Sequence, residues 1–136
     1  MAEKMELSFW FEGGENHAQF SAIVAANGFS GETGYVTYPS HWREFLDGIG
    51  HYPITDTIAL TIGEEFEDGP LLTLAIGPED RRGGLRVHVS LAANQDRSRK
   101  VSTDFGCVYS DVIRFAGEAE IGLRMGGTAV LAPDPN

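Results

Sequence analysis

The feature that most constrains this chain is a series of three alternating apolar segments between Thr57 and Leu91. In each segment, every second residue is large and apolar; these positions are Ile58, Leu60, Ile62, Leu72, Leu74, Ile76, Leu85, Val87, Val89 and Leu91. A period of two places one set of side chains on one face of a β-sheet. Polar segments containing Gly and Pro separate the three at 63–70 and 77–84, as in hairpin turns. The stretch therefore predicts a β-meander with one apolar face.

Four further segments alternate in the same way and are predicted to be strands: Met5–Phe11, Gln19–Ala26, the shorter Tyr35–Tyr38, and Val101–Cys107. The Asn27-Gly28 pair after the second of these is typical of a tight hairpin turn. The segment 95–100 is the turn expected before the last one.

A helical period replaces the alternation after Pro39, where Ser40 is a plausible N-cap. The apolar residues there fall at i, i+3, i+4 and i+7, namely Trp42, Phe45, Leu46 and Ile49. This spacing predicts a helix of about three turns, whose two aromatic residues cover the apolar face of the meander.

A second helix is predicted after Ser110, which can cap it, with Asp111 suited to the positive end of the helix dipole. Its apolar positions are Val112, Phe115, Ala116, Ala119 and Leu123. Gly117 and Gly122 oppose this prediction, because each costs about 1 kcal/mol relative to alanine inside a helix. The alternation of Ile121, Leu123 and Met125 also fits a strand, so 119–125 has two interpretations.

The order of elements is three strands, a helix, four strands and a helix, followed by a C-terminal tail at about 126–136. At 136 residues, we expect a single domain over 1–136 with one core. Helices that are separate from runs of strands indicate the α+β class. We predict a mainly antiparallel β-sheet of about six to seven strands, with two helices packed on one face and the other face open.

The composition restricts the partners and the compartment. Ten Lys and Arg residues against twenty Asp and Glu give a net charge of −10. We therefore expect no nucleic-acid partner and consider a basic protein partner, although acidity also serves solubility alone. No apolar run approaches the ~20 residues of a membrane span, and the N-terminus lacks a signal-peptide pattern. We expect a cytoplasmic protein that makes no membrane contact.

The residues that could carry chemistry form no catalytic, cofactor or metal signature. His41 and Glu44 share one side of the first helix, with His51 just beyond, but no second ligand pair accompanies them. Cys107 has the parity of Val101 and Phe105, so we expect a buried, inert thiol. We expect no catalytic residue, no cofactor and no metal.

Two basic segments were considered as anion sites. Arg81-Arg82-Gly83-Gly84 precedes a strand, whereas a phosphate-binding loop precedes a helix, so we interpret it as a turn. Arg97, Arg99 and Lys100 would lie near Arg86 if the adjacent strands pair, which would give a basic strip. A solvated sheet edge is the preferred interpretation of that strip.

Candidate partner-binding residues come from one loop and one sheet face. The loop carries the acidic residues Glu64, Glu65, Glu67 and Asp68. Loop tips are solvated, so these carboxylates suit recognition of a basic partner better than acid–base catalysis. Parity directs a second set away from the helices, namely Thr61, Thr73, Arg86, His88, Ser90 and Asp104.

Several segments resemble a broad group of small bacterial proteins of unknown function. They are the N-terminal strand pair, Phe29–Thr33, the helix Ser40–Leu46, and Ser110–Phe115 after the later strands. Some members of that group are immunity proteins, which neutralise the toxin of a neighbouring gene. The resemblance spans most of the chain and rests on the order of helices and strands. It implies a non-enzymatic, cytosolic, partner-binding role.

Three hypotheses follow. The first is a small interaction protein, such as an immunity protein, that occludes a basic partner through the acidic loop and the open sheet face. The second is a small-molecule-binding domain or minor enzyme that uses His88, Arg86 and the region of His41 and Glu44. The third is a homo-oligomer, for example a homodimer, joined through a sheet edge.

Overall fold

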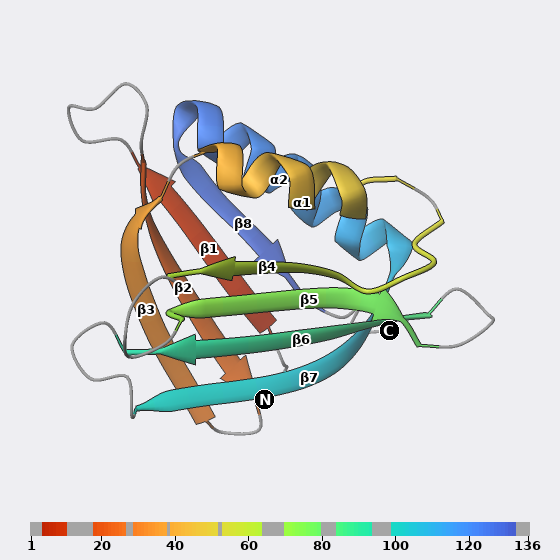
Figure 1. Ribbon diagram of the computed structural model, residues 1–136, viewed down its shortest axis with the longest axis horizontal. Helices are drawn as coiled ribbons and strands as arrows, with labels where there is room; N and C mark the ends of the chain where they lie inside the picture. Colours follow the sequence, from red (N-terminus) through yellow and green to blue (C-terminus); the bar gives the residue numbers. More distant parts are fainter. Residues whose placement is uncertain are drawn as a thin grey trace.

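The computed structural model describes residues 4–10, 18–26, 29–37, 39–51, 53–63, 70–79, 84–93 and 99–132. These residues form eight strands and two helices (Figure 1). In chain order they are β1 (Lys4–Trp10), β2 (Ala18–Ala26), β3 (Phe29–Thr37), α1 (Pro39–Ile49), β4 (Ile58–Ile62), β5 (Leu72–Pro78), β6 (Gly84–Ala92), β7 (Lys100–Val108), α2 (Tyr109–Met125) and β8 (Gly127–Leu131). The α+β class with mainly antiparallel strands is confirmed.

The strands form two four-stranded antiparallel sheets, where the sequence predicted one sheet of six or seven strands. The first sheet has the order β3-β2-β1-β8 and the second has the order β4-β5-β6-β7. The predicted turns at 63–70 and 77–84 do join antiparallel neighbours, although 64–69 and 80–83 lie outside the described residues. Alternation identifies a strand and its buried face, but it does not specify the sheet to which the strand belongs.

Two strands correct the sequence prediction. β3 begins at Phe29, six residues before the predicted start at Tyr35, and its glycines interrupt the apolar alternation there. The segment predicted to be a C-terminal tail contains β8, which pairs with β1. Residues 119–125 belong to α2, which excludes the alternative strand. The chain then reverses at Gly126 and Gly127, whose φ angles of 81° and 142° suit glycine.

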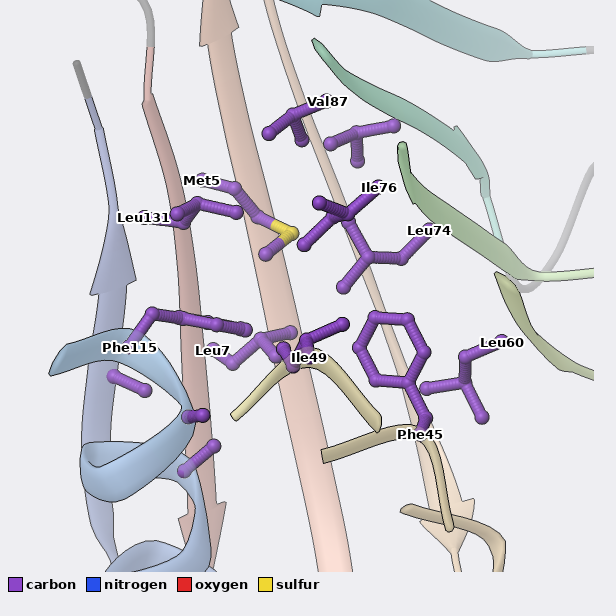
Figure 2. Close-up of a cluster of buried hydrophobic side chains, with 14 of the residues drawn as sticks. Met5, Leu7, Phe45, Ile49, Leu60, Leu74, Ile76, Val87, Phe115 and Leu131 are labelled. Atoms are coloured by element: carbon purple, nitrogen blue, oxygen red, sulfur yellow. The ribbon is translucent and has the colours of Figure 1, made fainter. Parts of the chain in front are cut away.

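The two sheets meet directly along one side and separate along the other. β2 and β3 cross β6 and β7, and a Cβ at Gly31 would overlap the side chain of Val101 at this crossing. On the other side, α1 packs on β4 and α2 packs on β1 and β8, so the helices fill the space between the sheets (Figure 1). Side chains from both sheets and both helices converge in a single core (Figure 2).

The aromatic residues of α1 contact both sheets. Trp42 is fully buried, and its ring meets Phe9 at 5.2 Å between centroids and 90° between planes. It also meets Phe20 edge-on at 5.9 Å, so its ring contacts β1 and β2 of the first sheet, which the sequence did not predict. Phe45 belongs to the core that includes Leu60 of the meander (Figure 2). α1 therefore joins the two sheets through side chains about one turn apart.

The start of α2 differs from the predicted cap. The helix begins at Tyr109, so Ser110 lies exposed in its first turn. The buried carboxylate of Asp111 accepts a hydrogen bond from the backbone N–H of Val108 at 3.3 Å, as an N-terminal cap would. The Tyr109 hydroxyl accepts a hydrogen bond from the backbone N–H of Ile54 at 2.8 Å, which ties the segment before β4 to α2.

Neither helix in the described part of the chain is long and apolar enough to cross a membrane.

The two glycines inside α2 should respond in opposite directions to alanine. At Gly122 a Cβ would lie 2.8 Å from Cδ2 of the buried Phe9 ring, whereas at Gly117 it would meet nothing within 4 Å. We expect Gly117→Ala to raise the free energy of unfolding by about 0.5–1 kcal/mol. Gly122→Ala should lower it by about 1–3 kcal/mol through overpacking. Urea denaturation of the two variants measures both; equal effects would contradict the close approach at Gly122.

We expect the buried hydroxyl of Thr33 to lower the free energy of unfolding. It is 4% exposed on the inner face of β3, and its hydroxyl makes no hydrogen bond with any described residue. Thr33→Val removes that hydroxyl at similar volume and should raise the unfolding free energy by about 1 kcal/mol. Thr33→Ser keeps the hydroxyl, loses a buried methyl and should lower it by about 1 kcal/mol. A destabilising Thr33→Val, measured by thermal and urea unfolding, would show that the hydroxyl is bonded in solution.

Candidate functional site

The outer face of the second sheet carries the residues that parity directed away from the helices. Most of its inner positions are buried, whereas Ile58, Val101 and Thr103 are half-buried. The outward positions are half-buried or exposed, apart from Gly77 and Ala92. We name as the outer β4–β7 face the outward residues Thr61, Thr73, Ala75, Arg86, His88, Ser90, Ser102 and Asp104. The described helices pack into the core on the opposite side of the sheet.

The strand register brings the predicted residues together in adjacent cross-strand rows. Thr61 pairs with Thr73, which pairs with Ser90. In the neighbouring row, His88 pairs with Asp104. Directly opposed residues lie about 5 Å apart, so these five side chains form one continuous polar patch. Because most of them are small, the patch is flat.

Two hydrogen-bonded polar pairs lie on or beside this face. Nδ1 of His88 lies 3.0 Å from Oδ1 of Asp104, and Nη1 of Arg86 donates to Oε1 of Glu79 at 3.2 Å. All four side chains are substantially exposed, so solvent screening leaves little contribution to stability. The exposed polar groups of these pairs can make directional hydrogen bonds to a partner.

The acidic loop residues Glu64, Glu65, Glu67 and Asp68 lie outside the described residues. The structure therefore does not place them relative to the outer β4–β7 face.

The basic strip is a prediction that the register contradicts. Lys100 pairs with Ala92 at one end of β6, whereas Arg86 pairs with Gly106 near the other end. Six residues along a strand correspond to roughly 20 Å, so Arg86 lies far from Arg99 and Lys100. Arg97 lies outside the described residues. Arg86 is near the start of β6 and Lys100 is at the start of β7, so the antiparallel pairing of these strands places them at opposite ends.

The helix residues considered for metal binding do not form a site in the described part of the chain. His41 and Glu44 are exposed on α1, and Nδ1–H of His51 donates to the backbone carbonyl of Asp47 at 2.6 Å. Among the described residues, no group of three or more His, Cys, Asp or Glu could hold a metal ion. The hypothesis that joined His41 and Glu44 to His88 fails geometrically, because α1 packs on β4 and α2 while His88 faces outward from β6.

An exposed apolar surface on α2 was missed by the sequence analysis. Ile113, Ile121 and Met125 are 46%, 47% and 76% exposed, and they recur every four residues with the open Gly117 between them. We name these four residues the α2 stripe. Exposed apolar side chains that gather in this way mark interaction surfaces more often than scattered ones do. The signal was visible in the sequence, because these residues fall outside the buried positions of the predicted helix.

Among the open grooves on the surface of the described residues, two have similar volumes. One, of about 400 Å³, lies between α1 and α2 and is lined by Arg43, Glu44, Leu46, Asp47 and Glu120. The other, of about 410 Å³, lies at the corner where β3 crosses β6 and β7.

Comparison with known proteins gives no relative: no protein family, no curated protein and no solved structure matches this chain.

Cys107 is buried, as parity predicted, and its environment opposes ionisation. Burial, followed by the charges of Asp111 and Glu79, raises the pKa of the thiol from 9.0 to about 12. The thiolate is the reactive form, so the folded protein should react with iodoacetamide at pH 8 at least about a hundredfold more slowly than the unfolded chain. Mass spectrometry of the alkylated protein measures the rates; equal rates would contradict the burial.

The raised pKa of Cys107 also predicts how the stability of the fold changes with pH. The native state binds the thiol proton more tightly than the unfolded chain, so this contribution is complete below about pH 9 and is lost as the pH rises towards 12. Cys107→Ala should remove that part of the alkaline loss of stability.

Proposed function

We propose that this chain is a non-enzymatic cytoplasmic protein-interaction module, of the kind that immunity proteins represent, and that it binds its partner through the outer β4–β7 face. The observation that carries the proposal is the face itself. It is flat, polar and left uncovered by both described helices. Sheets with one face on the core and one face in solvent are common. In this protein both described helices pack on the inner face, so neither covers the outer one.

The charge of the chain supports a basic partner. The net charge of −10 attracts a positively charged protein over distances of about a Debye length and raises its association rate. The outer β4–β7 face then provides the short-range hydrogen bonds. Attraction and recognition are thereby assigned to different parts of the surface.

The test uses the product of the gene adjacent to the one that encodes this chain, purified with it. We expect a complex whose affinity falls when the salt concentration rises, because the attraction is electrostatic. Ser90→Lys places a charged side chain in the centre of the outer β4–β7 face and should weaken binding by at least about tenfold, which corresponds to ~1.4 kcal/mol. Isothermal titration calorimetry measures the affinity of each variant.

The matched control is Ser21→Lys. Ser21 is a half-buried serine near the middle of β2, on the outer face of the first sheet, where Glu32 is its neighbour. The Ser21→Lys substitution should leave the affinity for the partner unchanged. Ile121→Lys, on the α2 stripe, separates the two candidate surfaces. If Ile121→Lys weakens binding and Ser90→Lys does not, the interface lies on α2, and the outer β4–β7 face is not the binding surface.

A further inference from the structure

The corner groove opens onto the interior of the protein between the two sheets. Three of its lining residues, Gly31, Leu91 and Val101, occupy inner-facing positions of β3, β6 and β7. Gly31 pairs with the buried Val24, and Leu91 pairs with Val101. Leu91 is 2% exposed and belongs to the main core. The floor of this groove therefore lies at the edge of the apolar core, where Gly31 and Val101 are half-buried.

The groove exists because the two sheets meet at a glycine. Gly31 and Val101 are already in contact at the crossing, where a Cβ on residue 31 would overlap the valine side chain. Among the described residues, the small Ala93 also lines this corner. The resulting volume of about 410 Å³ lies at the lower end of the range for small-molecule sites.

The rim of the groove carries charged residues of both signs, and they differ in the hydrogen bonds and ion pairs that they make with described residues. Glu32 on β3 accepts a hydrogen bond from Ser21 at 3.3 Å. On the other side, the backbone carbonyl of Arg99 accepts from Ala93 at 2.9 Å, which fixes the start of β7 and places Lys100 beside the groove. Lys100 is exposed and forms no ion pair with any described residue. Because its side chain is exposed, an anion in solvent can reach its ammonium group.

These observations restrict the chemistry of a ligand. An apolar floor below an available cation fits a molecule with an apolar body and one negative charge. The net charge of −10 on the whole chain disfavours nucleotides and other polyanions, whose repulsion grows with each added charge. We propose that the corner groove binds an amphipathic monocarboxylate, with the carboxylate at Lys100 and the aliphatic chain over Leu91 and Val101. Lys100 lies in the outward row next to Ser90 and Ser102, so this site borders the outer β4–β7 face.

The test titrates the isotope-labelled protein with butanoate, hexanoate and octanoate and follows backbone amide resonances by NMR. We expect saturable shifts at Gly31, Leu91 and Val101. The affinity should rise by about three- to fourfold for each methylene buried. Octylamine, which has the same chain and the opposite charge, should bind at least about tenfold more weakly than octanoate because Lys100 repels it. Shifts that do not depend on chain length would overturn the proposal, since they would indicate ion binding alone.

Two variants isolate the role of the cation. Lys100→Gln should weaken octanoate binding by about fivefold or more, since a charge-assisted contact is lost, and should leave octan-1-ol binding unchanged. Arg124→Gln removes an exposed cation from α2, far along the chain from the groove, and should change neither affinity. Equal octanoate affinities in wild type and Lys100→Gln, or shifts confined to α2, would show that octanoate does not occupy this site. Because no interaction partner takes part, this result is separable from the outcome for the outer β4–β7 face.

Discussion

The ring of Phe9 is the point at which both helices meet the first sheet, and the arrangement of the molecule depends on it. Trp42 of α1 packs edge-on against this ring at 5.2 Å, and Gly122 of α2 approaches it so closely that no Cβ fits. Aromatic edge-to-face contacts are directional, so they fix an orientation as well as burying area. With both helices held at β1, the second sheet can contact the first only on the side where Gly31 meets Val101.

This packing decides which surfaces remain for function. Open sheet edges invite association, but here each edge strand has a neighbour. The edge of β8 donates the Val130 N–H to the Glu118 carboxylate of α2 at 3.1 Å, and β4 lies against α1, where Gly48 packs on Ile58. β3 and β7 meet each other at the corner. The described sheet edges therefore give little support to the hypothesis of a homo-oligomer joined through an edge. The uncovered outer β4–β7 face gives more support to partner binding.

Features set by residues close together in the chain could be predicted from the sequence, whereas features set by distant residues could not. Alternation and helical spacing depend on neighbours within a few residues, so the meander, α1 and the inward side of Cys107 were predicted. β8 was missed because its strand is short and its partner, β1, lies at the other end of the chain. The basic strip failed although β6 and β7 do pair, because the register of that pairing places Arg86 opposite Gly106 and Lys100 opposite Ala92. The α2 stripe could have been found from spacing alone.

By itself, the sequence determined which side chains of β4, β5, β6 and β7 point inwards, and with that the composition of the outer β4–β7 face. A period of two is a local property that burial of one face enforces at every residue. Only the tertiary structure decided that the strands divide into two sheets, that Trp42 packs on the first of them, and that a groove opens beside Gly31 and Val101. Those outcomes depend on how the volumes of distant side chains fit together, and complementary shapes between segments far apart in the chain leave no periodic signal.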